Sequence, residues 1–303
     1  MTREDIFGLV VVFLFGSAIG SFLNVCIWRL PLGKSLLWPP SHCPKCFQPV
    51  GLWNVPILGY FLLRGRCAKC GDRFSFRYAF IEFLNGALLS YLYYHLVIQS
   101  GAPLPLFLAY ATLTMILVVA TFTDLDWKII PRTLTVFGVV VGLVFSAAWP
   151  KLHALYLGAR PGGGRFMEQI GRFVAQIPPL DGLFAALGGL TAGVLLILVV
   201  RWLGSVVFRR EAMGLGDAKL MAVIGAFLGW KAIPVVFLVA AFVGAVVGIA
   251  SWFRTREREM PLGPFLSLGA LVVMLHGNAL IRFWCVDVMH LESAPSILSQ
   301  FPR

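Results

Sequence analysis

Charged residues are scarce in this sequence: only 13% of its 303 residues are Asp, Glu, Lys or Arg, and 59% are apolar. Soluble domains usually contain about 25% charged and about 45–50% apolar residues. This scarcity excludes an ordinary soluble enzyme and a disordered chain. Six cysteines are also too few for a disulfide-rich scaffold of this length. A helical membrane protein with several spans is the class that remains.

Acidic residues are rarer still, with 14 Asp and Glu against 25 Lys and Arg. A net charge of +11 would fit a nucleic-acid-binding protein. In a membrane protein, however, positive charge gathers in the loops that stay in the cytoplasm. We therefore interpret most of the charge as an orientation signal, and we expect no nucleic-acid partner.

The apolar residues form long stretches without charges. A helix needs roughly 20 apolar residues to cross the hydrocarbon core. The sequence predicts about eight such spans, although the sixth is short; they fall at 6–27, 83–99, 103–123, 133–150, 182–200, 220–230, 232–253 and 261–281. The fold class is thus an all-α polytopic membrane protein.

The distribution of Lys and Arg gives these spans a direction. The loops on one side carry 17 of these residues and the other side carries 8. The positive-inside rule then predicts that the first group is cytoplasmic and that both termini are outside. The first stretch lacks a basic region before it and a clear cleavage site, so we expect a membrane helix and not a signal peptide.

Four regions follow from this pattern: a first membrane helix at 1–27, a small cytoplasmic domain at 28–82, a seven-helix membrane domain at 83–281, and a tail at 282–303. The membrane domain contains an extracytoplasmic insert at 151–181, in which apolar residues follow helical spacing after a glycine run. This insert fits a helix on the bilayer surface or a partner-binding helix.

Four of the six cysteines form two close pairs in the cytoplasmic domain: Cys43, Cys46, Cys67 and Cys70. The C-x2-C-x20-C-x2-C spacing is typical of a tetrahedral structural zinc site. A domain of this size often needs a metal to stay folded, and disulfides are disfavoured in the cytoplasm. Such a site leaves no open coordination position, so we expect zinc to do no chemistry here.

Two aspartates lie where membrane helices are expected to end. Asp124 ends the third span and Asp217 opens the sixth, so both belong on the cytoplasmic side. Glycines at 214 and 216 would permit close backbone approach and unusual dihedrals. If the two carboxylates face each other in a low-dielectric site, they hold one proton between them, as in an aspartic protease.

Two alternatives remain open on these residues alone. Each aspartate could pair with a nearby lysine, Asp217 with Lys219 and Asp126 with Lys128. The two aspartates could instead line a cation or proton path in a transporter or channel.

Several motifs together resemble the bacterial type IV prepilin (leader) peptidases, which are GxGD membrane aspartic proteases. The resemblance covers roughly residues 15–275. It is carried by Gly20-Ser21-Phe22-Leu23-Asn24-Val25, by the two cysteine pairs, by Arg77-Tyr78 with Glu82, by Asp124-Leu125-Asp126 with Ile130-Pro131, and by Gly214-Leu215-Gly216-Asp217-Ala218-Lys219.

The resemblance implies a function. A prepilin or pseudopilin would lose its basic leader after a glycine, and the new N-terminus would be methylated from S-adenosylmethionine. Asp124 and Asp217 match the catalytic pair, and the four cysteines match the zinc ligands. The implied location is the bacterial inner membrane, with the active site and zinc domain on the cytoplasmic side. The implied partners are the substrate helix and membrane lipid.

The sequence also departs from the family. Arg132 stands where the first motif usually has an Asp, and Asp126 is a rival to Asp124 that would point about 200° away on a helix. No glycine-rich S-adenosylmethionine motif occurs in 28–82. Asn24 and Glu82 are candidates for that site, although interhelical hydrogen bonding also explains them.

Overall fold

The structure is a computed structural model that describes residues 2–43, 45–49, 51, 55–153, 178–208, 214–255 and 261–282. Every regular element in these ranges is helical, apart from two isolated β-bridges in the cysteine-containing segment. The chain divides into two compact units, 1–131 and 132–303. The predicted all-α class is confirmed. The apolar helix expected in the insert lies largely at 154–177, outside the described residues.

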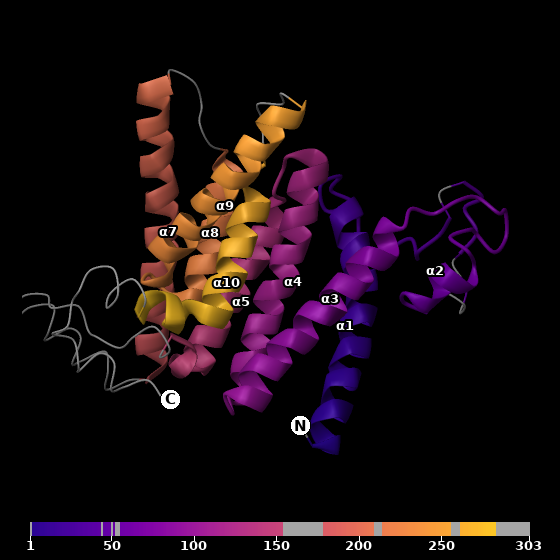
Figure 1. Ribbon diagram of the computed structural model, residues 1–303, viewed down its shortest axis with the longest axis horizontal. Coiled ribbons are helices and arrows are strands. Elements are labelled where there is room, and N and C mark those ends of the chain that lie inside the picture. Colours follow the sequence, from indigo (N-terminus) through magenta and orange to yellow (C-terminus); the bar gives the residue numbers. More distant parts are fainter. Residues whose placement is uncertain are drawn as a thin grey trace, which may run out of the picture. The chain divides into compact units, whose positions relative to one another are not determined.

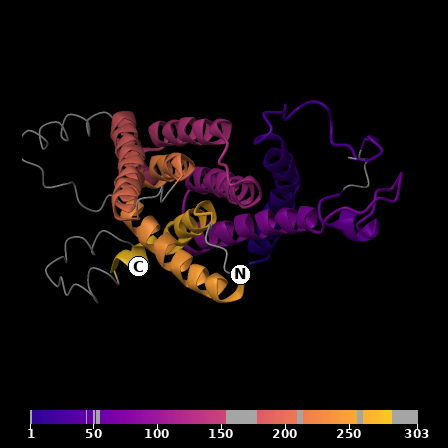
Figure 2. The same cartoon turned by 90° about the horizontal axis from the view of Figure 1, so that it is seen from above.

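The first unit begins with one long helix and ends with another (Figure 1). Its elements are α1 (Arg3–Arg29), α2 (Leu58–Leu62), α3 (Arg77–Tyr93), the π-helical turn η1 (Tyr94–Gln99) and α4 (Leu104–Trp127). The cysteine-containing segment connects α1 to α3 and contains α2. Helices α1 and α3 lie side by side in both views (Figures 1 and 2).

Small residues let α1 and α3 approach closely. A Cβ on Gly16 would lie 2.9 Å from the Cα of Gly86, and one on Gly20 would lie 2.8 Å from the Cα of Glu82. The Asn85 side chain donates a hydrogen bond to the Gly16 carbonyl at 2.7 Å. Close backbone contact with a buried polar bond is the usual way in which helices associate inside a membrane.

The second unit is built around one short, buried helix. Its elements are α5 (Arg132–Ala148), the 3-10 turn η2 (Pro150–His153), α7 (Pro178–Phe208), α8 (Leu215–Leu228), α9 (Ala232–Thr255) and α10 (Gly263–Arg282). Helices α5, α7, α9 and α10 all contact α8. Residues 220–228 of α8 are buried without exception. This explains why α8 is apolar all round.

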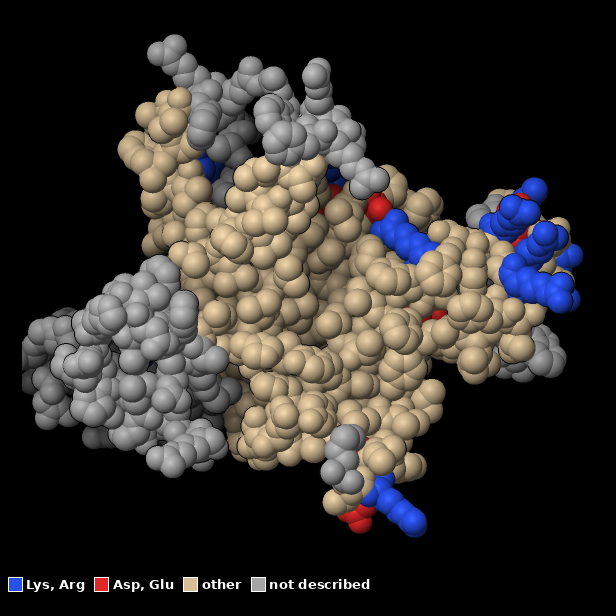
Figure 3. Space-filling model, viewed as in Figure 1, with Lys and Arg blue, Asp and Glu red and all other residues tan. Residues whose placement is uncertain are grey.

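The helices expose apolar side chains, as a membrane protein should. Only 22% of the most apolar window of α1 is buried, against 67% in α4. Figure 3 shows the described helical faces almost free of charge, while Lys and Arg gather around the segment that contains α2. Lipid is the solvent that would tolerate so much exposed apolar surface.

Each predicted apolar stretch overlaps a described helix, and the second stretch covers both the end of α3 and η1. Four helical segments are long and apolar enough to cross a membrane: Arg3–Arg29, Leu104–Trp127, Leu180–Val207 and Ala232–Ser251. Two further apolar segments, Arg132–Ala148 and Gly263–Gly277, are shorter. A helical membrane protein is therefore confirmed, and the number of eight crossings stays a prediction.

Candidate active site and metal centre

Asp124 lies in the last turn of α4 and is buried, with 6% of its surface exposed. The helix ends three residues later. Lys128 adopts a left-handed conformation (φ 52°), and its N–H donates to the Asp124 carbonyl at 2.9 Å. The predicted third span ended at 123, and the helix continues for four more residues, until the left-handed Lys128 stops it before Pro131.

Asp217 is the third residue of α8 and is also buried, with 8% of its surface exposed. An acidic side chain in a first turn interacts favourably with the positive end of the helix dipole. Gly214, the residue before the helix, has ordinary extended dihedrals (φ −77°, ψ 150°). The expectation that this glycine permits an unusual backbone is therefore wrong, since any residue could adopt that conformation.

The two aspartates occupy comparable positions, each buried at one end of an apolar helix. Asp124 belongs to the first compact unit and Asp217 to the second.

The four cysteines, in contrast, come together within one unit. Their sulfur atoms all lie within 4.8 Å of one another. The Sγ atoms of Cys43 and Cys70 are 3.7 Å apart, and those of Cys46 and Cys67 are 4.0 Å apart. Tetrahedral zinc with Zn–S bonds of about 2.3 Å requires sulfurs about 3.8 Å apart. These two separations are close to that value, so the four cysteines could hold a metal ion.

The two cysteine pairs sit on turns with the same hydrogen bonds. The N–H of Cys43 donates to Gln48, and the N–H of Phe47 donates back to Cys43, at 3.0 and 2.9 Å. In the second turn, Cys67 donates to Asp72 and Gly71 donates to Cys67, at 2.7 and 3.0 Å.

The fourth residue after the first cysteine has a positive φ in each turn. It is Phe47 (57°) in the first and Gly71 (74°) in the second. The repeated geometry aims both pairs at one point.

The electrostatics of this cluster favour a bound cation. Backbone N–H groups of Cys70 and Lys69 lower the pKa of the Cys67 thiol to about 6. At Cys70, a backbone hydrogen bond from Asp72 acts in the lowering direction, but desolvation and the neighbouring sulfurs outweigh it and raise the pKa to about 12. Crowded thiols cannot all ionise unless a metal compensates their charge.

The two candidates for the S-adenosylmethionine site each make a hydrogen bond to the backbone of another element or segment. The Asn24 side chain of α1 donates to the Tyr78 carbonyl of α3 at 3.1 Å. The buried Glu82 carboxylate accepts a bond from the Ile57 N–H at 2.7 Å. Asn24 therefore makes the interhelical bond that the second interpretation expected, and Glu82 attaches the cysteine-containing segment to α3.

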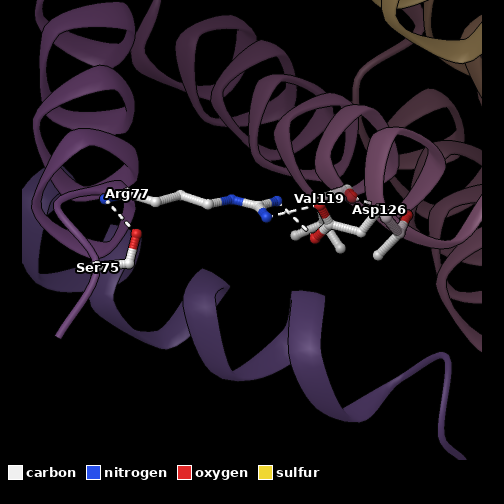
Figure 4. A network of polar contacts seen from close by, with 5 residues as sticks. Ser75, Arg77, Val119 and Asp126 are labelled. Carbon is white, nitrogen blue, oxygen red and sulfur yellow. Dashed lines mark hydrogen bonds and ion pairs between the residues drawn. The ribbon is translucent and has the colours of Figure 1, made fainter. Parts of the chain in front are cut away.

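Sequence reasoning missed the partner of Asp126. Both carboxylate oxygens of Asp126 accept bonds from the Arg77 guanidinium, each at 2.6 Å (Figure 4). The two residues are 49 positions apart, on α3 and α4. Arg77 belongs to one of the family motifs, but no local pattern in the sequence indicates its partner.

Comparisons with known families agree with these features. Residues 14–96 match the family described as Bacterial Peptidase A24 N-terminal domain. Residues 169–249 match the Type IV leader peptidase family. The first match contains the four cysteines, the second contains Asp217, and Asp124 lies between them.

Individual relatives cover most of the chain. A prepilin leader peptidase/N-methyltransferase of Aeromonas hydrophila is 33% identical over 92% of this chain and 94% of its own length. The protein of the same name from Legionella pneumophila is 30% identical over the same shares. One from Myxococcus xanthus is 36% identical over 81% of this chain and 64% of its own length. No solved structure matches the chain.

Proposed function

We propose, from the premise that this chain belongs to the type IV leader peptidase family, that Asp124 and Asp217 are the catalytic pair of its peptidase. The observation that carries the proposal is the burial of both carboxyl groups at helix ends, inside motifs that match the family's two catalytic motifs. Ionisable groups at membrane depth are costly and therefore mark functional sites.

The activity follows from the family. The chain is a prepilin peptidase with an N-methyltransferase activity, as its relatives are named. Its substrates are prepilins or pseudopilins, whose basic leader it removes before the new N-terminus is methylated. A transporter with an Asp-lined path is not favoured, because the relatives that cover nearly the whole chain are named as processing enzymes.

The proposed chemistry needs one proton shared by two carboxylates. The ionised carboxylate takes a proton from water, which attacks the carbonyl carbon of the scissile amide. The protonated carboxyl group then donates to the leaving nitrogen, so the two groups exchange roles. The low dielectric at these buried positions strengthens the electrostatic interaction of each carboxyl group with the reacting atoms.

The cysteine cluster has a structural role in this proposal. Zn²⁺ held by Cys43, Cys46, Cys67 and Cys70 would connect the two turns of the segment between α1 and α3. Four thiolates fill its coordination sphere, so the metal stabilises the fold and takes no part in peptide cleavage. S-adenosylmethionine supplies the methyl group for the second activity, which we assign to no described residue.

The arrangement in the membrane is part of the same proposal. Eight spans divide the chain into the first helix (1–27), the cytoplasmic zinc domain (28–82), the membrane peptidase domain (83–281) and the tail (282–303). The protein then lies in the inner membrane of a bacterial cell, with both aspartates and the zinc domain on the cytoplasmic side. The supporting observation is the excess of Lys and Arg in the loops on that side.

Replacing Asp124 or Asp217 with Asn tests the catalytic pair. We expect each change to lower prepilin cleavage by at least about a thousandfold, because Asn can neither activate water nor donate the proton. Asp181→Asn is the matched control, since Asp181 also lies in the first turn of an apolar helix but is exposed. Full cleavage by either Asp124→Asn or Asp217→Asn would refute the assignment.

A further inference from the structure

We infer that Arg77 and Asp126 are positioning residues, whose ion pair fixes the rotation of the last turn of α4 and thereby the direction of the Asp124 carboxyl group. The inference rests on the proposed role of Asp124. It also gives Asp126, the second aspartate of the Asp124-Leu125-Asp126 motif, a positioning role that differs from the catalytic role of Asp124.

The ion pair has well-defined geometry. The two guanidinium nitrogens of Arg77 each lie 2.6 Å from one oxygen of Asp126. Figure 4 shows the arginine extending from the start of α3 to the end of α4. Its own backbone N–H donates to the Ser75 hydroxyl at 3.3 Å, just before α3 begins. Paired parallel bonds of this kind set orientation as well as distance.

The same arginine contacts a second residue of α4. Its guanidinium carbon lies 5.1 Å from the centre of the Phe122 ring. Phe122 and Asp126 are four residues apart and therefore lie on one face of the helix. Phe80 of α3 also meets the Phe122 ring edge-on, with centroids 6.4 Å apart. That face of α4 is therefore held by α3 over a full turn.

Helix α1 holds the same turn at another point. The rings of Trp28, in α1, and Trp127, the last residue of α4, pack edge to face with centroids 5.9 Å apart. Beyond Trp127 the chain leaves the helix at the left-handed Lys128. Helix ends fray, so tertiary contacts must hold this turn in one orientation.

The orientation of Asp124 follows from helix geometry. Successive residues are 100° apart, so Asp124 points about 200° away from Asp126. With Asp126 bound to α3, the Asp124 carboxyl group is directed to the other side of α4. A rotation of the last turn would move it off its target, and misplacing a catalytic group by about 1 Å can cost a hundredfold in rate.

The pair is not arranged as a catalytic dyad or as a main source of stability. Both Asp126 oxygens are already bonded to Arg77. The side chains of Arg77 and Asp126 are 38% and 28% exposed, and ion pairs at such sites contribute little to the free energy of unfolding. The ion pair therefore serves to fix the orientation of the last turn of α4.

A double-mutant cycle on prepilin cleavage tests the inference. We expect Arg77→Gln and Asp126→Asn each to lower kcat about tenfold with KM within about twofold of wild type. The double variant should lose no more than either single variant, because one interaction is removed in all three. Arg77→Lys, which keeps the charge but not the fork, should also lower kcat. Thermal unfolding and the amount of folded protein are measured for each, so that kcat refers to folded enzyme.

Lys34→Gln is the control, because Lys34 is exposed in the same unit and its loss should leave kcat unchanged. Wild-type kcat in Asp126→Asn or Arg77→Gln would overturn the inference, as would additive losses in the double variant. Asp126→Asn as inactive as Asp124→Asn would show instead that Asp126 is catalytic. An active Asp124→Asn variant would remove the proposed function itself, and this result is distinct from all the others.

Discussion

The Ser146 hydroxyl lies 2.9 Å from Nε2 of His153, and both side chains are buried in the second unit. Ser146 also donates to the Gly142 carbonyl at 2.7 Å, so the imidazole N–H donates to the serine oxygen. The other ring nitrogen, Nδ1, has no hydrogen-bond partner among the described residues. The site thus suits a neutral imidazole. A second ring proton, on Nδ1, would find no hydrogen-bond acceptor among the described residues.

This pair makes the stability of the protein sensitive to acid. Burial lowers the pKa of His153 to about 4, from an ordinary 6.5. Above pH 6.5 the imidazole is mainly neutral in both the folded and the unfolded state, so His153 does not lower the free energy of unfolding there. Between pH 6.5 and 4 the unfolded chain binds a proton that the folded site does not, so the free energy of unfolding falls by roughly 3 kcal/mol.

Thermal unfolding in detergent at pH 7.5 and 4.5 measures this effect. We expect His153→Gln to lose less stability on acidification than the wild type. His276→Gln is the control, because His276 is exposed in the same unit and should behave as wild type. An identical acid sensitivity in His153→Gln and the wild type would contradict the account.

The contact between α7 and α8 predicts a contrast between two adjacent glycines. A Cβ on Gly189 would collide with the Gly225 backbone, whereas one on Gly188 would meet only the Trp230 ring, at 3.9 Å. We expect Gly189→Ala to lower the free energy of unfolding by about 1–3 kcal/mol, as overpacking does. Gly188→Ala should change it little. Equal unfolding temperatures for the two variants would mean that the helices do not pack in this way.

Metal content tests the cysteine cluster. Purified protein should contain about one zinc per chain, and Cys67→Ser should lose most of it, because a tetrahedral site needs all four thiolates. Removing the metal with a chelator should expose the segment between α1 and α3 to proteolysis. Cys26→Ser serves as the control, since Cys26 is buried in α1 and should not affect metal content. Metal-free protein with four reactive thiols would exclude the zinc site.

Features encoded by local spacing were predictable from the sequence. The two C-x2-C pairs predicted one cluster, because each pair is a turn with its sulfurs directed together. The uncharged stretches predicted the helices, because apolar runs of this length are stable in apolar surroundings and are long enough for membrane helices. The position at which α4 ends was not predictable, since a lysine carries no preference for the left-handed conformation of Lys128.

Features that depend on helix rotation could not be predicted. The bond between Arg77 and Asp126, and the contact between Gly189 and Gly225, join residues far apart in sequence. Apolar composition gives no preferred face in helices that are apolar on most sides, so it does not specify which side meets a neighbour. Resemblance to a family identified the motif residues but did not indicate their partners.

The most direct test of the central claim is the separation of the two aspartate side chains in an experimental structure with substrate. The Asp217→Asn variant should bind prepilin without cleaving it. The account predicts that the side-chain carboxyl and amide carbons at 124 and 217 lie within about 8 Å of each other and on either side of the scissile bond, within reach directly or through one water. A separation beyond about 10 Å, with the scissile bond next to neither residue, would contradict it.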